Sequence, residues 1–246
     1  MNRFIFALIF FLNQFAFCGV DIPGGVTSGY VSCSNPSSGI LNPPYITVSF
    51  WFYMDSQNAP NVFIAKRSGT TAGLFFVYFS GTGGGTAAIS TYADGAANTW
   101  NSPYMPSIGK WTHAVFTYDG LNKMFYADSV PYGPNTDDSG PLTPVSTALI
   151  VGSDSISARY FLDGKMDDIR IYNRALNQQE IQSLYLSRSR LNITEGLVLW
   201  LPMDEYKTGE TIQSGTKFVD RSAYDNYCVW IGTNGMPAPQ SILNYP

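Results

Sequence analysis

Apolar side chains recur at every second position in several short stretches of this chain. In the clearest stretch, residues 46–54, Ile46 and Phe50 share one face, while Thr47 and Tyr53 lie on the other. This period of two predicts a strand with one face in a core. Further strands are predicted at residues 29–34, 62–66, 74–79, 87–92, 111–118, 123–126, 148–151 and 169–172. The chain is therefore predicted to be mostly β.

One short helix is predicted at residues 177–186. Asn177 can cap its start, and Glu180 stands at the position that completes a capping box. Ile181 and Leu184 then fall on one face, with the spacing of an amphipathic helix. That face is expected to pack against another part of the protein.

Residues 93–109 follow no regular pattern and contain Trp100 and Tyr104 among Asn, Ser and Pro residues. Long loops often carry binding sites, and aromatic faces stack on sugar rings while polar groups bond the hydroxyls. We therefore predict a glycan site at Tyr92, Trp100 and Tyr104, and Tyr132 and Tyr206 fit the same description. The alternative is that Trp100 only plugs one end of the fold.

The sequence GKMDDIRIYNRAL, followed by QEIQSLY, resembles the C-terminal signature of laminin-G-like domains. The segments ITVSFWFYMD, KWTHAVFTYDG and ALIVGS precede it in the order of that family, so the resemblance covers residues 30–185. It implies an all-β, two-sheet antiparallel jelly-roll sandwich of the concanavalin A-like type. Because lectins, adhesion modules and inactive passengers on enzymes share this fold, the resemblance alone gives no function.

The segments GLVLWLPMDEYKTGETI and FVDRSAYDNYCVWIGTNG resemble strands that open the domain in this family, yet here they follow the helix. Either a second repeat is cut short, or one domain is circularly permuted. A half-repeat would expose the apolar faces of Leu199 and Ile231, which water disfavours. We therefore expect residues 29–186 to form the main body and residues 196–246 to complete the same sandwich.

Residues 1–18 have the pattern of a secretory signal peptide. Arg3 precedes an apolar run over residues 4–12, and Ala16 and Cys18 occupy the small-residue positions before Gly19. The run is short for a membrane anchor, and a lipoprotein site fits less well. We predict a secreted, extracellular domain of residues 19–246, without a transmembrane segment after cleavage.

Removal of residues 1–18 leaves two cysteines, Cys33 and Cys228. In an oxidising compartment a disulfide between them is expected, and two buried free thiols are the alternative. Asn192 begins the glycosylation sequon Asn-Ile-Thr, which matters only in a eukaryotic host.

The composition argues against several kinds of chemistry. A net charge of -4 provides no basic patch for nucleic acid. No strand carries the alternating carboxylates that glycosidases of this fold use. His113 is the only histidine, so a catalytic triad would depend on it, and we expect it to be a packed structural residue. We therefore predict that the protein is not an enzyme.

Calcium differs from these cases, because it takes oxygen ligands from loops and because secreted proteins encounter it at high concentration. If Ile169 and Ile171 face the core, period two turns Asp167 inward and Asp168 outward with Arg170. A buried carboxylate requires a cation or a proton, so Asp167 is predicted to bind a structural Ca²⁺. Weaker candidates for the same site are Asp204 and Asp220. The alternative is a carboxylate held by backbone N–H groups.

These observations predict a secreted, non-catalytic module that recognises carbohydrate through the loops of a lectin-like jelly roll. The alternative is a structural or adhesive surface protein that contacts other extracellular proteins. A glycoside hydrolase is the least favoured hypothesis.

Overall fold

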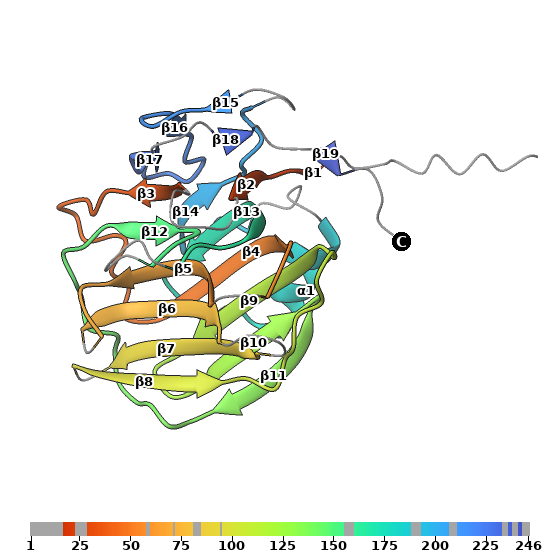
Figure 1. Ribbon diagram of the computed structural model, residues 1–246. Coiled ribbons are helices and arrows are strands. Elements are labelled where there is room, and N and C mark those ends of the chain that lie inside the picture. The colour runs from red at the N-terminus through yellow and green to blue at the C-terminus, as the bar shows by residue number, and fades with distance from the viewer. Residues whose placement is uncertain are drawn as a thin grey trace, which may run out of the picture.

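The structure is a computed structural model, shown in Figure 1. It describes residues 17–22, 29–57, 60–70, 72–80, 85–93, 95–154, 160–187, 193–206, 211–232, 236–237 and 241–242. Asn192 and most of the predicted signal peptide lie outside the described residues, so both stay predictions.

Two antiparallel sheets lie face to face and form the body of the protein (Figure 1). The seven-stranded sheet contains, in spatial order, β11 (Val130–Asn135), β10 (Lys123–Ala127), β9 (Thr112–Tyr118), β4 (Ile46–Met54), β13 (Gly164–Tyr172) and β14 (Leu197–Leu201), and β2 (Val20–Ile22) also pairs with β13. The eight-stranded sheet contains β16 (Lys217–Phe218), β17 (Cys228–Ile231), β3 (Tyr30–Cys33), β12 (Leu149–Val151), β5 (Asn61–Arg67), β6 (Gly73–Phe79), β7 (Ala87–Ala93) and β8 (Ala96–Asn101). The predicted two-sheet jelly-roll sandwich is confirmed.

Two short ladders stand beside these sheets. They are formed by β1 (Phe17–Cys18) with β19 (Ser241–Ile242), and by β15 (Thr211–Ile212) with β18 (Met236–Pro237). Among the described residues, no helix has the length and apolar composition needed to cross a membrane.

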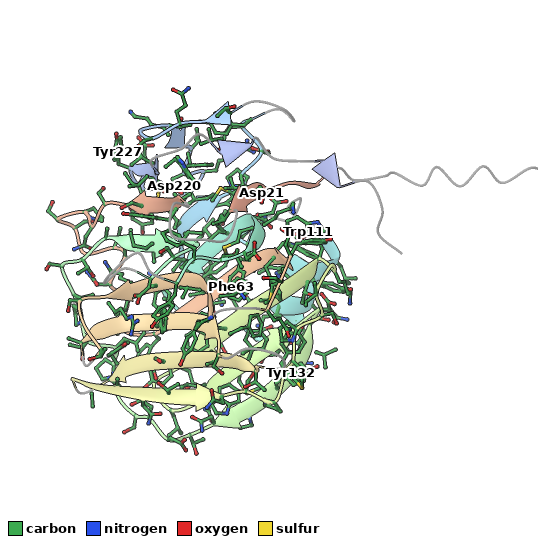
Figure 2. The ribbon with its side chains drawn as sticks, in the orientation of Figure 1. Asp21, Phe63, Trp111, Tyr132, Asp220 and Tyr227 are labelled. Atoms are coloured by element: carbon green, nitrogen blue, oxygen red, sulfur yellow. A yellow bond between two sulfur atoms is a disulfide. The ribbon has the colours of Figure 1, made fainter. Side chains whose placement is uncertain are left out.

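The core between the two sheets is rich in phenylalanine. The ring centroids of Phe50 and Phe63 lie 5.4 Å apart, and those of Phe63 and Phe79 lie 5.0 Å apart. Figure 2 shows Phe63 between the two layers. These contacts form because Phe50 of β4, Phe63 of β5 and Phe79 of β6 all point into the space between the sheets, where aromatic burial contributes strongly to stability.

Strands from the last third of the chain complete both sheets. β14 pairs with β13 in the seven-stranded sheet, and β17 pairs with β3 in the eight-stranded sheet. This is the arrangement that circular permutation requires.

The predicted disulfide is confirmed. Cys33 and Cys228 are direct partners in the pairing of β3 with β17, and their Cα atoms are 4.0 Å apart. Both residues are buried in the core. The bond therefore joins the first strand of the eight-stranded sheet, in chain order, to its last strand.

The predicted helix is present as α1 (Gln178–Ser187), one residue later than expected. The amide of Glu180 donates to Asn177 Oδ1 at 3.0 Å, and the Asn177 amide donates to Glu180 Oε2 at 2.9 Å. These reciprocal bonds form the capping box. Buried Ile181 and Leu184 pack with Tyr172 on the outer face of the seven-stranded sheet.

His113 lies on that same outer face and is buried, as expected for a packed residue. Its Nε2 is 2.9 Å from Ser49 Oγ, and its ring centroid is 5.1 Å from that of Trp51. Burial, and secondarily the charge of Arg170, lowers the pKa of His113 to about 3. The imidazole is therefore neutral in the folded protein near neutral pH.

One prediction about secondary structure is wrong. Residues 93–109 were expected to be irregular, but residues 96–101 form β8, which pairs with β7 throughout its length. Small and polar side chains such as Ala97 and Thr99 give a weak apolar alternation, because this strand lies at a sheet edge with one side exposed.

Replacing both Cys33 and Cys228 by serine should lower the free energy of unfolding by roughly 5 kcal/mol, because the loop-entropy model assigns that cost to a closed loop of this length. The sequence separation is 195 residues. Urea unfolding followed by tryptophan fluorescence measures the difference. A loss below about 1 kcal/mol, the size of an average point mutation, would show that the bond constrains little.

The neutral His113 should make the protein sensitive to acid. Its folded pKa is lowered from 6.5 to about 3, so its stabilising contribution is complete above pH 6.5 and is lost as pH falls toward 3. The expected slope is about 1.4 kcal/mol per pH unit. His113→Gln still offers polar groups to Ser49 but does not titrate. In urea unfolding measured between pH 6.5 and 3, its free energy of unfolding should therefore lack the pH dependence that His113 contributes. Parallel slopes for the two proteins would contradict the prediction.

Candidate functional site

The outer face of the eight-stranded sheet carries one row of residues that crosses all its strands. Directly paired residues of antiparallel strands point to the same face, so the row can be followed from the pairing register. It consists of Lys217, Val229, Ser32, Ile150, Ala65, Phe76, Ser90 and Thr99. Its middle is buried, whereas both ends reach solvent.

The buried middle contains an arginine held between a carboxylate and a ring. Arg67 donates from Nε to Asp154 Oδ1 at 3.0 Å and from Nη2 to Asp154 Oδ2 at 2.7 Å. Its guanidinium carbon lies 3.9 Å from the ring centroid of Phe76, which stacks on Tyr78 at 4.4 Å. Since Asp154 already neutralises Arg67, this cluster provides no surplus charge for an anionic ligand.

Tyr92 belongs to this buried middle and does not line a loop. Only 1% of it is exposed, and it packs with Val62, Ala65 and Phe76. A ligand cannot stack on a ring that is covered in this way. The assignment of Tyr92 to a glycan site is therefore corrected.

Trp100 and Tyr104 lie on the other side of the sheet from Tyr92. Trp100 pairs with the core residue Ile89, and a Cβ on Gly133 of β11 would lie 3.0 Å from the Trp100 ring. Both aromatic residues are half-buried against the core.

The Tyr104 ring lies 5.2 Å from that of Tyr132, which Figure 2 shows at the margin of the two layers. Trp100, Tyr104 and Tyr132 thus close the opening between edge strands β8 and β11, which is the plug alternative. The three residues predicted as one glycan site, Tyr92, Trp100 and Tyr104, are not brought together.

The exposed end of the row, on β16, β17 and β3, carries accessible aromatic and polar groups. Tyr227 is 52% exposed, and Lys217 Nζ lies 4.9 Å from the centroid of its ring. Figure 2 shows Tyr227 at the surface, far from Tyr132. We call this surface the tyrosine platform, and it consists of Tyr30, Ser32, Lys217, Tyr227 and Val229.

The backbone beneath the tyrosine platform is firmly held. Cys228 and Trp230 alternate with the platform residues and point into the core, where Cys228 forms the disulfide. A Cβ on Gly29 would lie 1.8 Å from the Trp230 ring, so only glycine leaves room for this indole. The sequence contained a signal for the platform, because Tyr227 and Val229 occupy the outward positions of an alternating strand.

The second predicted site, around Asp167, differs from the expected geometry. Core residues Met166 and Ile169 are three positions apart, and the register of β13 with β4 shifts between Asp167 and Arg170. Asp168 adopts a φ of 45° at this bulge. The argument from strict alternation is therefore wrong.

Asp168 does not point to solvent. It is buried, and its Oδ1 accepts bonds from Arg170 Nε at 2.9 Å and Trp200 Nε1 at 2.8 Å. The guanidinium of Arg170 also lies 4.5 Å from the Trp200 ring centroid. Asp168 is thus the counter-charge of a buried arginine.

Asp167 is also buried, and its Oδ1 accepts a bond from the Asp168 amide at 2.9 Å. Burial first, then the charges of Asp168, Asp204 and Glu205, raises the pKa of Asp167 well above its usual value. Burial likewise raises the pKa of Glu205. The acidic side chains near Asp167 therefore repel one another.

The other two predicted calcium ligands have protein partners. Asp204 pairs with Arg221 at 2.8 Å, and both side chains are partly exposed. Asp220 accepts five hydrogen bonds, among them those from the amides of Trp200 and Asn226. Within the described ranges, no group of three or more His, Cys, Asp or Glu side chains could hold a metal ion. Calcium at Asp167 stays a prediction.

Comparison with known sequences gives one family and a receptor. The model of the concanavalin A-like lectin/glucanases superfamily matches residues 24–182. Human adhesion G-protein coupled receptor D1 is 25% identical over 142 residues, which cover 56% of this chain and 16% of the receptor. The chain thus spans about one sixth of that relative.

Solved structures with the same fold include two proteins connected with carbohydrate. A Bacteroides ovatus protein with a proposed carbohydrate-binding role has a TM-score of 0.68 and 14% identity, over 94% of this chain and 63% of that one. The CBM40 of Ruminococcus gnavus IT-sialidase, bound to α2,3-sialyllactose, has a TM-score of 0.55 and 15% identity, over 70% of this chain and 98% of that one. At these identities the likeness shows the fold alone.

Thermal unfolding with calcium and with chelator tests the role of Asp167. If Asp167 binds calcium, the melting temperature of the wild type should fall by several degrees in chelator, while Asp167→Asn should melt alike in both. In chelator at neutral pH, Asp167→Asn should also be more stable than the wild type, because it removes a buried charge. Each gain of about 1–2 kcal/mol in the free energy of unfolding should raise the melting temperature by a few degrees.

The pH dependence in chelator has a defined sign. Because the folded pKa of Asp167 is raised, wild-type stability should fall as pH rises above 3.8. Asp168→Asn serves as the comparison, since it removes the counter-charge of Arg170 and should destabilise the protein with or without calcium. Identical melting of the wild type in both solutions would rule out the calcium site.

Proposed function

This chain belongs to the concanavalin A-like lectin/glucanases superfamily, and we propose that it is a secreted, non-catalytic module that binds carbohydrate on the tyrosine platform. The observation that carries the proposal is the pair of outward tyrosines, Tyr30 and Tyr227, on a strand pair fixed by a disulfide. Polar Ser32 and Lys217 lie between them.

The dimensions of the platform suit a short oligosaccharide. In the register of β3 with β17, Tyr30 lies opposite Ile231, and Tyr227 stands four residues before Ile231, directly ahead of β17. Four residues of strand span roughly 13 Å, about the length of two or three sugar rings. A sugar ring stacked on Tyr227 would place its hydroxyls near the Lys217 ammonium group, which can donate three hydrogen bonds.

Two further observations support the proposal. The structural likeness includes a module bound to sialyllactose and a protein with a proposed carbohydrate-binding role. The platform also lacks the features of a hydrolase, since its only charged member is Lys217 and glycosidases require a pair of carboxylates.

Secretion is supported by the disulfide and by the apolar run before it. Disulfides such as Cys33–Cys228 persist in oxidising compartments and are rare in the cytosol. The apolar run of residues 4–12 is typical of a signal peptide. Both observations favour an extracellular location.

A protein ligand is the second candidate, favoured by the rim of the platform. Val219 and Ile231 are exposed apolar residues at opposite ends of the platform, since Val219 follows the partner of Cys228 and Ile231 lies opposite Tyr30. An aromatic centre with an apolar rim also suits contact with another extracellular protein. This would be an adhesive role.

Glycan-array binding tests the proposed function. Tyr227→Ala should weaken binding to the best glycans by roughly 10-fold, because one stacking contact is worth about 0.5–1.5 kcal/mol beyond the lost area. Lys217→Ala should weaken binding by a similar or smaller factor. The matched control is Tyr45→Ala, since Tyr45 is 40% exposed but lies against Gly120 on the β9–β10 turn.

Equal binding by Tyr227→Ala and wild type would place the site elsewhere. Absence of binding to any glycan, with the fold intact, would leave the carbohydrate proposal without support and favour the protein ligand.

A further inference from the structure

The four edges of the two sheets are protected unequally. Unpaired backbone N–H and C=O groups on an edge strand are a template for another strand, and proteins usually cover or interrupt them. On β11, Pro131 and Pro134 remove two N–H groups. At the edge of the eight-stranded sheet formed by β16, the strand has only two residues.

The edge at β14 is covered by the loop that follows β16. Asp220 Oδ1 accepts the Trp200 amide at 2.8 Å, and the Arg221 amide donates to the Trp200 carbonyl at 2.8 Å. Asn226 Nδ2 donates to the Val198 carbonyl, also at 2.8 Å. The carboxylate of Asp220 organises this cover, which explains its five bonds. On the same side of β13, β2 has only three residues.

The fourth edge, β8, has none of these protections. Its six residues include no proline and no charged side chain. The Ser102 amide donates to the Ala87 carbonyl, which flanks the pair Asn101 and Ala88. In an antiparallel ladder this pattern directs the backbone groups of Asn101 away from β7, and the same holds for every second residue before it.

The residues with outward backbone groups are therefore Ala97, Thr99 and Asn101, and all three are exposed. Within the part of the chain that the structure describes, their N–H and C=O groups have no hydrogen-bond partner. Unmet donor–acceptor pairs at every second residue of an uncharged strand are what an added antiparallel strand requires.

We propose that β8 pairs with β8 of a second copy of this chain. A twofold axis through Thr99 sets Thr99 opposite Thr99 of the second copy, and Ala97 opposite its Asn101. Each of these three residue pairs is closed by two hydrogen bonds. All the outward groups are then satisfied in a self-complementary, closed contact.

The side chains of β8 permit this contact. The members facing outward are small or neutral, so no like charges meet across the axis. The Thr99 hydroxyl lies 2.7 Å from Ser90 Oγ of its own chain. This hydrogen bond keeps the Thr99 side chain away from the contact between the two β8 strands. A contact confined to one edge strand buries little surface, so the dimer is a weak, concentration-dependent one.

The dimer would add to the proposed function. Its existence does not depend on glycan binding, but its biological role rests on the proposed function. The two eight-stranded sheets would become one continuous sheet, with one tyrosine platform near each of its two outer ends. β17 is six strands from β8, so the platforms would stand roughly 60 Å apart at about 4.8 Å per strand. Two weak sites at a fixed spacing would bind a multivalent glycan surface more tightly than either alone.

Sedimentation velocity over a dilution series tests the dimer without any glycan. Wild type should shift from monomer to dimer as concentration rises. Thr99→Pro should stay monomeric, because it removes an outward N–H that the fold itself does not use. Thr99→Lys and Thr99→Glu should each stay monomeric as well, since the axis brings identical charges together.

An equal mixture of Thr99→Lys and Thr99→Glu should dimerise again, because opposite charges then meet at the axis. The matched control is Val130→Lys, which adds the same charge to an exposed position on the edge strand β11 and should dimerise like wild type. Circular dichroism checks that each variant is folded.

A wild type that is monomeric throughout would overturn the proposal, as would Thr99 variants that dimerise unchanged or a mixture that stays monomeric. Loss of glycan binding in Tyr227→Ala leaves sedimentation unaffected, so the two proposals can fail separately.

Discussion

The sandwich depends on the pairing of β17 with β3. Through this ladder Cys228 and Trp230 enter the core, and β16 gains a strand on which to pair. Closing so long a stretch of chain costs conformational entropy, which the disulfide lowers by restricting the unfolded state. The outward residues of the same strands form the tyrosine platform. Core and platform are therefore two faces of one ladder, and a change that loosens β17 should affect both.

The bulge in β13 shows how one inserted residue changes the chemistry of a surface. Strict alternation would have buried one acid and exposed the next, but the extra residue between Met166 and Ile169 buries both Asp167 and Asp168. Asp168 and Arg170 therefore form a buried ion pair, not an exposed one. The spacing of three between two core residues was visible in the sequence, since a period of two cannot produce it. The alternation correctly set Asp168 on the side of Arg170, but it did not show that this pair would be buried, because burial depends on the neighbouring elements.

The fold could be predicted from the sequence much further than the site could. Alternating positions, the Asn177–Glu180 capping pattern and the two cysteines are local or nearly local signals, and each predicted its element or bond. The glycan residues were sought in a loop, but Trp100 and Tyr104 seal the gap between β8 and β11. A sandwich open at one margin needs large side chains there, and aromatic residues meet that need. The platform joins segments almost two hundred residues apart, so only the topology brings Tyr30 and Tyr227 to one surface.

The physical character of the platform explains why the rest of the sheet matters for binding. Two partly exposed tyrosines and one lysine on the face of a sheet offer few contacts. A ligand also loses translational and rotational freedom when it binds, at a cost of several kcal/mol. A rigid backbone reduces the additional cost of ordering the protein, and here the disulfide and the buried Trp230 supply that rigidity. Rigidity alone leaves a single site weak. A protein with such a site gains strength mainly by presenting several sites at once, and the free edge of β8 is where this sheet can be extended without disturbing either the core or the platform.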